Sequence, residues 1–314
     1  MHRLILHHWD TDGICSAALL YNEECANITP KIGNYFLEEE EIEWITSNFE
    51  EVWIVDLALH ENSLKKIVER VKVRVFDHHI TKKVEGVSYV NPIMEGDEEE
   101  KWPSASWIVG EHIEVKNLLS YLGVVGDWEE RIKKTKFYPT LKRFMEENNL
   151  SFEELHEMVY LIDANYKMGD KKEVEEAVKN LWRAEDKASF IMNNEKWRRR
   201  KEKIEEEIKK AIEGEEERIG SIIIKRMNCP YNIISTVARK LWDGNGYVIV
   251  INDGYFRENC QVYVRGNTAG KLIDMAVGMG YVAGGKKNVM GAIVPKDECE
   301  EFIKKIIEVI KNGG

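Results

Sequence analysis

The sequence predicts an α/β protein in which a parallel-sheet domain is joined by a long connector helix to a smaller α/β domain. Three observations lead to this prediction. Short apolar runs alternate with helical segments in the first half, a long charged stretch follows, and the strand-and-helix pattern restarts after Gly220. The 314 residues allow roughly two domains. We therefore expect domains at 1–185 and 219–314, with the connector at 186–218.

In the first half, the predicted strands are short and almost wholly apolar. They lie at 4–7, 51–55 and 73–76, and the helices between them lie at 13–22 and 63–71. Such strands, alternating with helices, are typical of a parallel sheet covered on both faces. In these sheets the ligand site lies at the carboxyl ends of the strands.

The remainder of the chain is helical, then charged, then mixed. Residues 104–181 predict mostly helices, and 187–218 indicates an exposed helix held by ion pairs between residues four apart. The last third predicts strands and helices in turn, at 221–224, 232–242, 247–252, 261–265, 268–277, 289–294 and 297–311. This last pattern is the smaller α/β domain.

Composition excludes several classes of protein. No apolar run approaches the ~18 residues of a membrane span, and the amino terminus runs straight into a strand, so we expect a cytoplasmic protein without membrane contact. The five cysteines form no Cys-x-x-Cys pair, which favours free buried thiols over a zinc finger. Gln261 is the only glutamine in a chain rich in Glu, Lys and Ile, a bias that indicates a thermophile. The net charge of −11 neither indicates nor excludes nucleic-acid binding.

Acidic and histidine side chains follow each of the three predicted strands of the first half. They are His8, Asp10 and Asp12, then Asp56, then Asp77, His78 and His79. Like charges gathered at a buried sheet edge are costly, so the cluster needs a compensating cation. Two divalent ions about 4 Å apart can clamp a phosphate and activate a water. Asp56 is the natural bridge between two such ions, and imidazole ligands favour Mn²⁺ over Mg²⁺.

Each of these residues also has a structural interpretation when it is taken alone. A single Asp after a strand is usually a helix cap or a loop residue, and a lone His is usually a satisfied polar group. We expect His7 to be such a group, because it lies out of phase with His8. Three clusters at the ends of neighbouring strands are hard to explain in this way, which favours a metal site.

The pattern resembles the four motifs of the DHH phosphoesterase superfamily. The matching stretches are His8-x-Asp10-x-Asp12-Gly13, Asp56, Asp77-His78-His79, and Asp127 within Gly123-x-x-Gly126-Asp127. The one-residue spacing between His8 and Asp10 is similar to that of RecJ-like nucleases, including archaeal ones, and of small oligonucleotide phosphodiesterases. Family pyrophosphatases resemble this pattern less, since three residues separate their His from the first Asp.

This resemblance implies two Mn²⁺ ions, with Mg²⁺ or Co²⁺ as alternatives. It assigns His8, Asp10 and Asp56 to one ion. It assigns the other ion to four residues, which are Asp12, Asp56, His78 and Asp127. In the same family pattern Asp77 orients a ligand, and His79 holds the scissile phosphate.

The last third resembles the DHHA1 domain that accompanies such catalytic domains. The family's glycine-rich signature matches the stretch from Ala283 to Gly291, with Lys286 in place of the usual His and Val289-Met290 in place of a small pair. Further back, 163–169 loosely resembles a substrate-contacting turn of RecJ proteins. The substrate contacts that these matches imply are Arg265, Gly284, Gly285, Lys286, Asn288, Asn165 and Lys167.

The function expected from the resemblance is a Mn²⁺-dependent exonuclease of single-stranded DNA or RNA that releases nucleoside 5′-monophosphates in DNA repair or replication. Polarity is expected to be 3′→5′, since the chain lacks the extra domain of the bacterial 5′→3′ enzymes. One alternative is a phosphodiesterase of short oligoribonucleotides or cyclic dinucleotides. Another is a non-catalytic replisome scaffold. A helicase or replisome protein is the protein partner that the family suggests.

Overall fold

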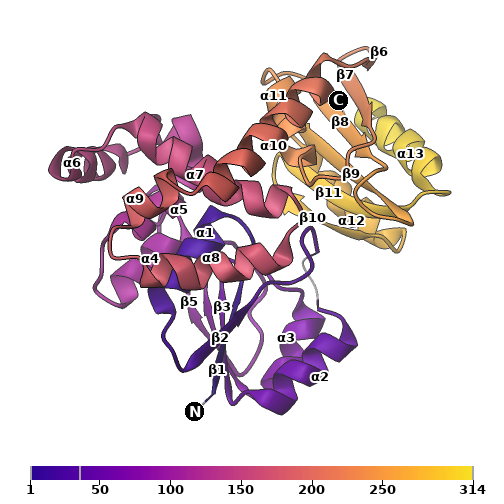
Figure 1. Cartoon of the computed structure of the whole chain (residues 1–314). Coiled ribbons are helices and arrows are strands. Elements are labelled where there is room, and N and C mark those ends of the chain that lie inside the picture. The colour runs from indigo at the N-terminus through magenta and orange to yellow at the C-terminus, as the bar shows by residue number, and fades with distance from the viewer. Residues whose placement is uncertain (1, 35–36, 313–314) are drawn as a thin grey trace. The chain divides into compact units, whose positions relative to one another are not determined.

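The chain forms two compact units, residues 1–201 and 202–314, in a computed structural model that describes residues 2–34 and 37–312 (Figure 1). The fold class is confirmed: the first unit contains a parallel sheet and the second contains a sheet of its own. The division between the units falls inside the stretch predicted as the connector. Residues 1 and 313–314, the outermost residues of the predicted domains, lie outside the described residues.

The first sheet has five strands, all parallel, in the order β2-β1-β3-β4-β5. The strands are β1 (Arg3–His7), β2 (Cys25–Ile28), β3 (Glu51–Val55), β4 (Lys72–Phe76) and β5 (Val87–Val90). The three predicted strands are confirmed and form the centre of the sheet. The two edge strands, β2 and β5, were not predicted from the sequence.

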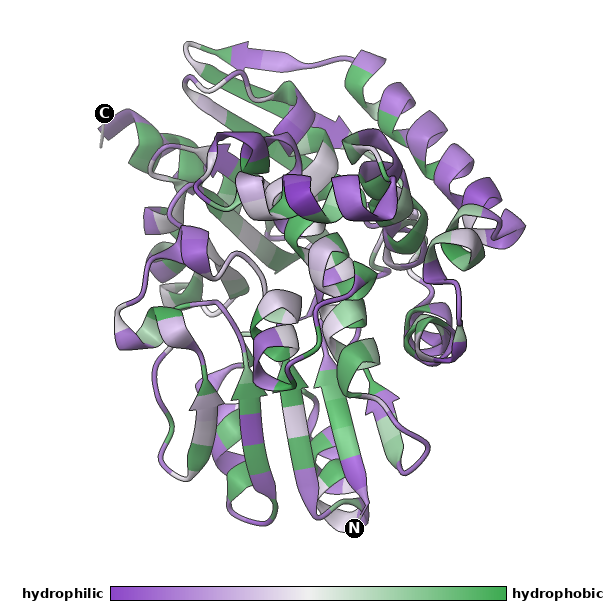
Figure 2. Cartoon of the chain, turned by 90° about the vertical axis from the view of Figure 1, so that its left-hand side faces the viewer, coloured by the Kyte–Doolittle hydropathy of each residue, from purple (hydrophilic) through white to green (hydrophobic). Residues whose placement is uncertain are grey.

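Helices cover both faces of this sheet, and further helices of the first unit pack outside that layer. They are α1 (Thr11–Leu20), α2 (Glu39–Asn48), α3 (Glu61–Val68), α4 (Ala105–His112), α5 (Leu118–Trp128), α6 (Tyr138–Asn148), α7 (Phe152–Lys167) and α8 (Lys171–Arg183). On one face, α2 and α3 pack Ile45 and Ile67 against strand residues such as Val52. On the other face, α1 contacts β1 and β3, and α4 contacts β4. Figure 2 shows the hydrophobic colouring of the strands between these layers.

The charged stretch after α8 differs from the single helix that was predicted. It contains α9 (Lys187–Met192), α10 (Glu195–Glu213) and the first strand of the second sheet, β6 (Glu217–Ile219). The break arises because the Asn194 side chain accepts a hydrogen bond from Trp197 N, which starts a new helix. Although most of α10 is polar, Trp197 is completely buried and Arg200 donates to Asn165 and Asp170. This face of α10 therefore anchors the helix to the first unit.

The second unit is built on six strands in the order β10-β11-β9-β8-β7-β6. Besides β6, they are β7 (Ile222–Met227), β8 (Tyr247–Asn252), β9 (Asn259–Gly266), β10 (Val282–Lys286) and β11 (Val289–Pro295). Only β7 and β8 pair in parallel within the described sheet, and β8 and β9 form an antiparallel hairpin. One face packs against α12 (Leu272–Gly278) and α13 (Cys299–Asn312), while α11 (Ile234–Leu241) contacts β8 and β9.

The cysteines and the hydropathy of the helices were also subjects of the sequence predictions. All five cysteines are buried and none is in a disulfide, as expected. Within the part of the chain that the structure describes, no helix has the length and hydropathy needed to span a bilayer.

Trp197 provides a test of how α10 is attached to the first unit. Replacement by alanine removes a fully buried indole and its hydrogen bond to Glu173, so Trp197→Ala is expected to destabilise the protein by about 3–5 kcal/mol. Trp197→Phe keeps most of the buried area and should cost about 1–2 kcal/mol. Denaturant unfolding of both variants checks the difference, and equal losses would contradict it.

Candidate metal centre

The site is built where the three central strands of the first sheet end together. The register pairs His7 with Val55 and Val55 with Phe76, so the carboxyl ends of β1, β3 and β4 are level. The polar residues His8, Asp56 and Asp77 come directly after these ends. Asp56 adopts a left-handed backbone (φ 52°), which is uncommon for a residue with a side chain. This turn is held by a hydrogen bond from Asp56 N to Phe76 O (2.9 Å).

The first group of side chains at this edge is His8, Asp10 and Asp56. One ligand atom from each lies within 4.8 Å of the others. His8 Nδ1 is 2.8 Å from Asp10 Oδ2 and 3.6 Å from Asp56 Oδ2. These are the three residues expected to hold one ion.

The second group is Asp12, His78 and Asp127, which also meet the 4.8 Å condition. His78 Nε2 is 3.0 Å from Asp127 Oδ2 and 3.5 Å from Asp56 Oδ1. The two oxygens of Asp56 therefore face the imidazoles of the two groups, one each. The structure thus brings together all six side chains predicted as ligands, with Asp56 between the groups; their binding of metal stays a prediction.

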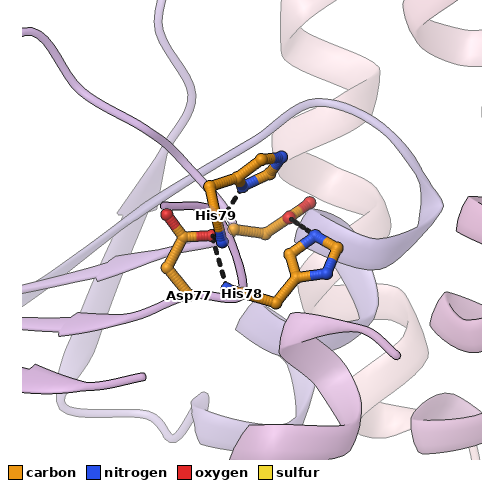
Figure 3. A group of neighbouring side chains, drawn as sticks. Asp77, His78 and His79 are labelled. Atoms are coloured by element: carbon orange, nitrogen blue, oxygen red, sulfur yellow. Dashed lines mark hydrogen bonds and ion pairs between the residues drawn. The ribbon is translucent and has the colours of Figure 1, made fainter. Parts of the chain in front are cut away.

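Asp77 and His79 form a separate pair beside the second group, and Figure 3 shows His79 turned toward the Asp77 carboxylate while His78 points away from it. Asp77 Oδ1 is 2.7 Å from His79 Nδ1 and accepts hydrogen bonds from the backbone N–H of His78 and His79. Asn91 holds the same turn by donating to His79 O (2.7 Å). The contact between Nδ1 and Asp77 fixes the orientation of the His79 imidazole ring, and Nε2 lies on the side of the ring away from that contact. Asp77, His78, His79 and Asp56 also form a third set close enough to share an ion.

Asp12 is held by the start of α4, a contact that was not predicted from the sequence. Ala105 N donates to Asp12 Oδ2 (2.7 Å), and Ser106 N donates to Asp12 Oδ1 (2.9 Å). These are backbone groups of a helix N-terminus, which favours an anionic partner. The only local signal in the sequence is the capping serine, Ser104, whose hydroxyl accepts from Trp107 N. Nothing in that signal identifies Asp12 as the partner.

Two glycines of the motifs are needed for close packing around the ligands. A Cβ at Gly13 would overlap His8 O, and a Cβ at Gly123 would overlap both Ser106 Oγ and Asp12 Oδ1. Gly123 therefore lets α5 approach α1 and α4 closely enough to place Asp127 next to Asp12. His7, in contrast, is the structural group that was predicted. Its Nδ1 bonds to His8 O and its Nε2 lies 3.3 Å from Asn27, while burial lowers its pKa to about 4.

The electrostatics of the cluster match a divalent cation. Burial and the charge of Asp127 raise the pKa of Asp12 to about 7, and burial together with Asp12 and Asp10 raises the pKa of Asp56 well above its ordinary value. Burial acts to lower the pKa of His78, but Asp127 and Asp56 raise it well above 6.5. Buried carboxylates that repel one another this strongly are stabilised by bound cations. Mixed carboxylate and imidazole donors suit Mn²⁺, so the residues present fit the predicted pair of ions.

The substrate contacts predicted in the last third lie on the second sheet. Arg265 on β9 is opposite Val289 on β11, which is opposite Lys286 on β10, so the two cationic residues share one row. The Arg265 guanidinium lies 5.2 Å from the centre of the Trp242 ring. Gly284 and Gly285 are in β10, and Asn288 is in the turn before β11, where its carbonyl accepts from Gly266 N. Their contact with a substrate stays a prediction.

The other two predicted contacts, Asn165 and Lys167, lie on α7 in the first unit. Asn165 is completely buried, donates to Ile162 O and accepts from Arg200. Lys167 is also buried and pairs with Asp163 at 3.3 Å. Binding of a substrate by either side chain would require these contacts to open.

Part of the first unit matches a known protein family. Residues 3–134 match the family described as the DHH family, N-terminal domain. None of the curated proteins matches the sequence.

Solved structures share the fold over almost the whole chain. RecJ from Thermus thermophilus in complex with Mn²⁺ has a TM-score of 0.70 and 17% identity, covering 99% of this chain and 52% of that one. An exonuclease RecJ bound to manganese has a TM-score of 0.66 and 17% identity, covering 99% and 90%. The pGpG-specific phosphodiesterase PggH from Vibrio cholerae has a TM-score of 0.52 and 14% identity, covering 100% of both chains. This chain thus spans about half the length of the Thermus protein, and the likeness is one of fold.

Gly123 and Gly126 offer a matched test on one helix. An added methyl at Gly123 overlaps Asp12, whereas one at Gly126 meets only ordinary contacts, 3.4 Å or more from Thr11 and Val159. Gly123→Ala should therefore weaken Mn²⁺ binding by about 10-fold or more, as removal of support for a ligand does. Gly126→Ala should bind as the unaltered chain does. Calorimetric titration with Mn²⁺ checks both, and equal affinities for the two variants would refute the role given to Gly123.

The pH dependence of the metal-free protein follows from the raised pKa values. Asp12 and Asp56 ionise more readily in the unfolded chain, so the stability linked to them is present below the ordinary carboxyl pKa and is lost as pH rises through the folded values, about 7 for Asp12. His78, whose pKa is also raised, acts in the same direction. Chelator-treated protein should therefore unfold at a lower temperature at about pH 8 than at about pH 5.5. Added Mn²⁺ should remove most of this difference, and Asp56→Asn should reduce it; a higher unfolding temperature at pH 8 would contradict the prediction.

Proposed function

Because the chain carries a DHH family N-terminal domain within a RecJ-like fold, we propose that it is a Mn²⁺-dependent exonuclease that hydrolyses single-stranded DNA or RNA to nucleoside 5′-monophosphates. The observation that supports this most directly is the pair of ligand groups at one sheet edge, with Asp56 in the first group and 3.5 Å from His78 of the second. Two divalent ions at such a site polarise the scissile phosphate and lower the pKa of the attacking water.

The side chains of the site are proposed to have three roles: binding of the ions, orientation of a ligand, and stabilisation of charge on the phosphate. His8, Asp10 and Asp56 would hold one ion, and Asp12, His78 and Asp127 would hold the other with Asp56 between them. The hydrogen bonds from Ala105 N and Ser106 N hold the Asp12 carboxylate in one orientation before substrate binds. His79, oriented by Asp77, is suited to donate from Nε2 to a phosphate oxygen and so to stabilise the charge that develops there.

Recognition of the strand is proposed to involve the second unit. Arg265 and Lys286 share a row across the sheet, and Gly284 and Gly285 lie on β10, the strand that carries Lys286. Arginine and lysine bind phosphates without reading the base, so this row suits a nucleic-acid backbone or end. A 3′→5′ polarity, action in DNA repair or replication, a helicase or replisome partner, and a thermophilic archaeal source belong to the same proposal.

Two other functions remain as alternatives. PggH, whose fold this chain shares over its whole length, is a pGpG-specific phosphodiesterase, so a substrate of two nucleotides is a real competitor to a long strand. A non-catalytic scaffold is the second. The retention of all six predicted ligands in one cluster favours catalysis over a scaffold.

One experiment separates these functions. Oligonucleotides of 2 and about 20 nucleotides, labelled at either end, are incubated with the full chain and Mn²⁺, and the products are resolved by length. The proposed exonuclease shortens the long strand stepwise from its 3′ end and releases mononucleotides. Cleavage of the dinucleotide alone would establish the first alternative, and the absence of cleavage of either substrate would favour the scaffold.

Activity should depend on the ligands. Loss of a residue that merely supports a metal ligand typically costs 10–100-fold, so Asp56→Ala and His78→Ala, which remove ligands themselves, should reduce turnover by about 100-fold or more. Asp97→Ala is the control, because Asp97 is a surface carboxylate that bonds to Trp102 and Lys101. It should retain full activity. Full Mn²⁺-dependent activity in either of the first two variants would overturn the proposed function.

A further inference from the structure

The segment from His8 to Asp12, which joins β1 to the start of α1, carries three of the six predicted ligands, and Thr11 is the first residue of α1. Thr11 stands between Asp10 and Asp12, whose side chains belong to different ligand groups. It is almost completely buried. The backbone conformation at Thr11 therefore affects the distance between the carboxylates of Asp10 and Asp12.

A carboxylate from α7, 152 residues away in the chain, holds Thr11 in this position. Asp163 Oδ1 accepts hydrogen bonds from Thr11 N (3.0 Å) and from Thr11 Oγ1 (2.7 Å). The same hydroxyl lies 3.2 Å from Val159 O, one turn earlier in α7. Both the backbone and the side chain of Thr11 are thus attached to one helix. Hydrogen bonds to an ionised acceptor are about twice as strong as neutral ones.

The carboxylate is in turn held by a lysine on its own helix. Lys167 Nζ is 3.3 Å from Asp163 Oδ2, the oxygen that Thr11 does not use, and both side chains are largely shielded from water. A buried carboxylate next to a metal cluster that is already rich in carboxylates is costly unless it is paired. Lys167 provides that pairing, so the two oxygens of Asp163 have different partners and one orientation.

From these contacts we infer that Asp163, held by Lys167, is a positioning residue for the metal centre, which acts through Thr11 to fix the separation of Asp10 and Asp12. The inference rests on the proposed function, because it assumes that these aspartates bind ions. It gives Lys167 a role in the first unit that needs no contact with the substrate. It also explains why the turn is attached to α7 by a charged residue instead of by apolar packing alone.

The test is Mn²⁺ binding by calorimetry on the full chain, which does not depend on activity. Asp163→Ala removes both hydrogen bonds to Thr11 and is expected to weaken binding of at least one ion by about 10-fold or more. Asp163→Asn keeps a carbonyl oxygen for Thr11 but places an uncharged amide N–H₂ opposite Lys167, so it should restore only part of the affinity. Thr11→Val removes only the hydroxyl contact and should give an intermediate affinity.

Glu157→Ala is the matched control. Glu157 lies on the same helix and forms an ion pair with Lys201 (2.8 Å), away from the turn, so its loss should leave Mn²⁺ affinity unchanged. Unfolding in chelator separates a positioning role from a purely structural one. A structural role would lower the unfolding temperature of metal-free Asp163→Ala without a change in its Mn²⁺ affinity.

The outcomes distinguish this inference from the proposed function. If the unaltered chain binds fewer than two Mn²⁺ ions, the proposed function fails. If it binds two, unchanged affinity in Asp163→Ala overturns the inference alone, as does an equal loss in Asp163→Asn. Should Asp163→Ala fail to fold, Thr11→Val and Asp163→Asn decide the question: the inference predicts weaker Mn²⁺ binding in both than in the unaltered chain, and unchanged affinity in both would overturn it.

Discussion

Repulsion among buried carboxylates is the constraint on which the rest of this structure depends. Four aspartates, Asp10, Asp12, Asp56 and Asp127, meet at the carboxyl edge of one parallel sheet, and the imidazoles of His8 and His78 lie against all of them except Asp12. An apolar environment raises the free energy of each buried charge and strengthens the repulsion between neighbouring carboxylates. The raised pKa values of Asp12 and Asp56 are consequences of this burial and crowding. Bound divalent cations would replace this repulsion with attraction between each carboxylate and a cation.

The cluster is held by parts of the chain that lie far from it in sequence. The N-terminus of α4 donates two backbone hydrogen bonds to Asp12, and α7 holds Thr11 through Asp163. The absence of a side chain at Gly123 allows α5 to bring Asp127 to the edge. Each of these supports comes from a helix packed against α1. The helical layer on this face of the sheet therefore covers the core and also fixes the geometry of the candidate metal centre.

The strands that could be predicted and those that could not differ in their place in the sheet. Central strands bury side chains on both faces, so they read as continuous apolar runs, as Leu4-Ile5-Leu6 does in β1. The unpredicted strands β2, β5 and β6 are all at sheet edges, and so is β10, which had been treated only as a glycine-rich motif. Edge strands are short and partly exposed, as the half-buried residues of β5 illustrate. Their residues carry no apolar pattern long enough to identify them, because pairing on one side is sufficient to hold them.

The sequence by itself determined which residues reach the sheet edge. A polar residue that directly follows an apolar strand must lie at the carboxyl end of that strand, and this local rule placed His8, Asp56 and Asp77 at the sheet edge. Only the tertiary structure decided what holds them. The contacts of Asp12 with Ala105 and Ser106, and of Thr11 with Asp163, join segments more than 90 residues apart. Such contacts use backbone groups and single side chains whose partners are chosen by helix packing, and helix packing has no signature in the spacing of residues along the chain.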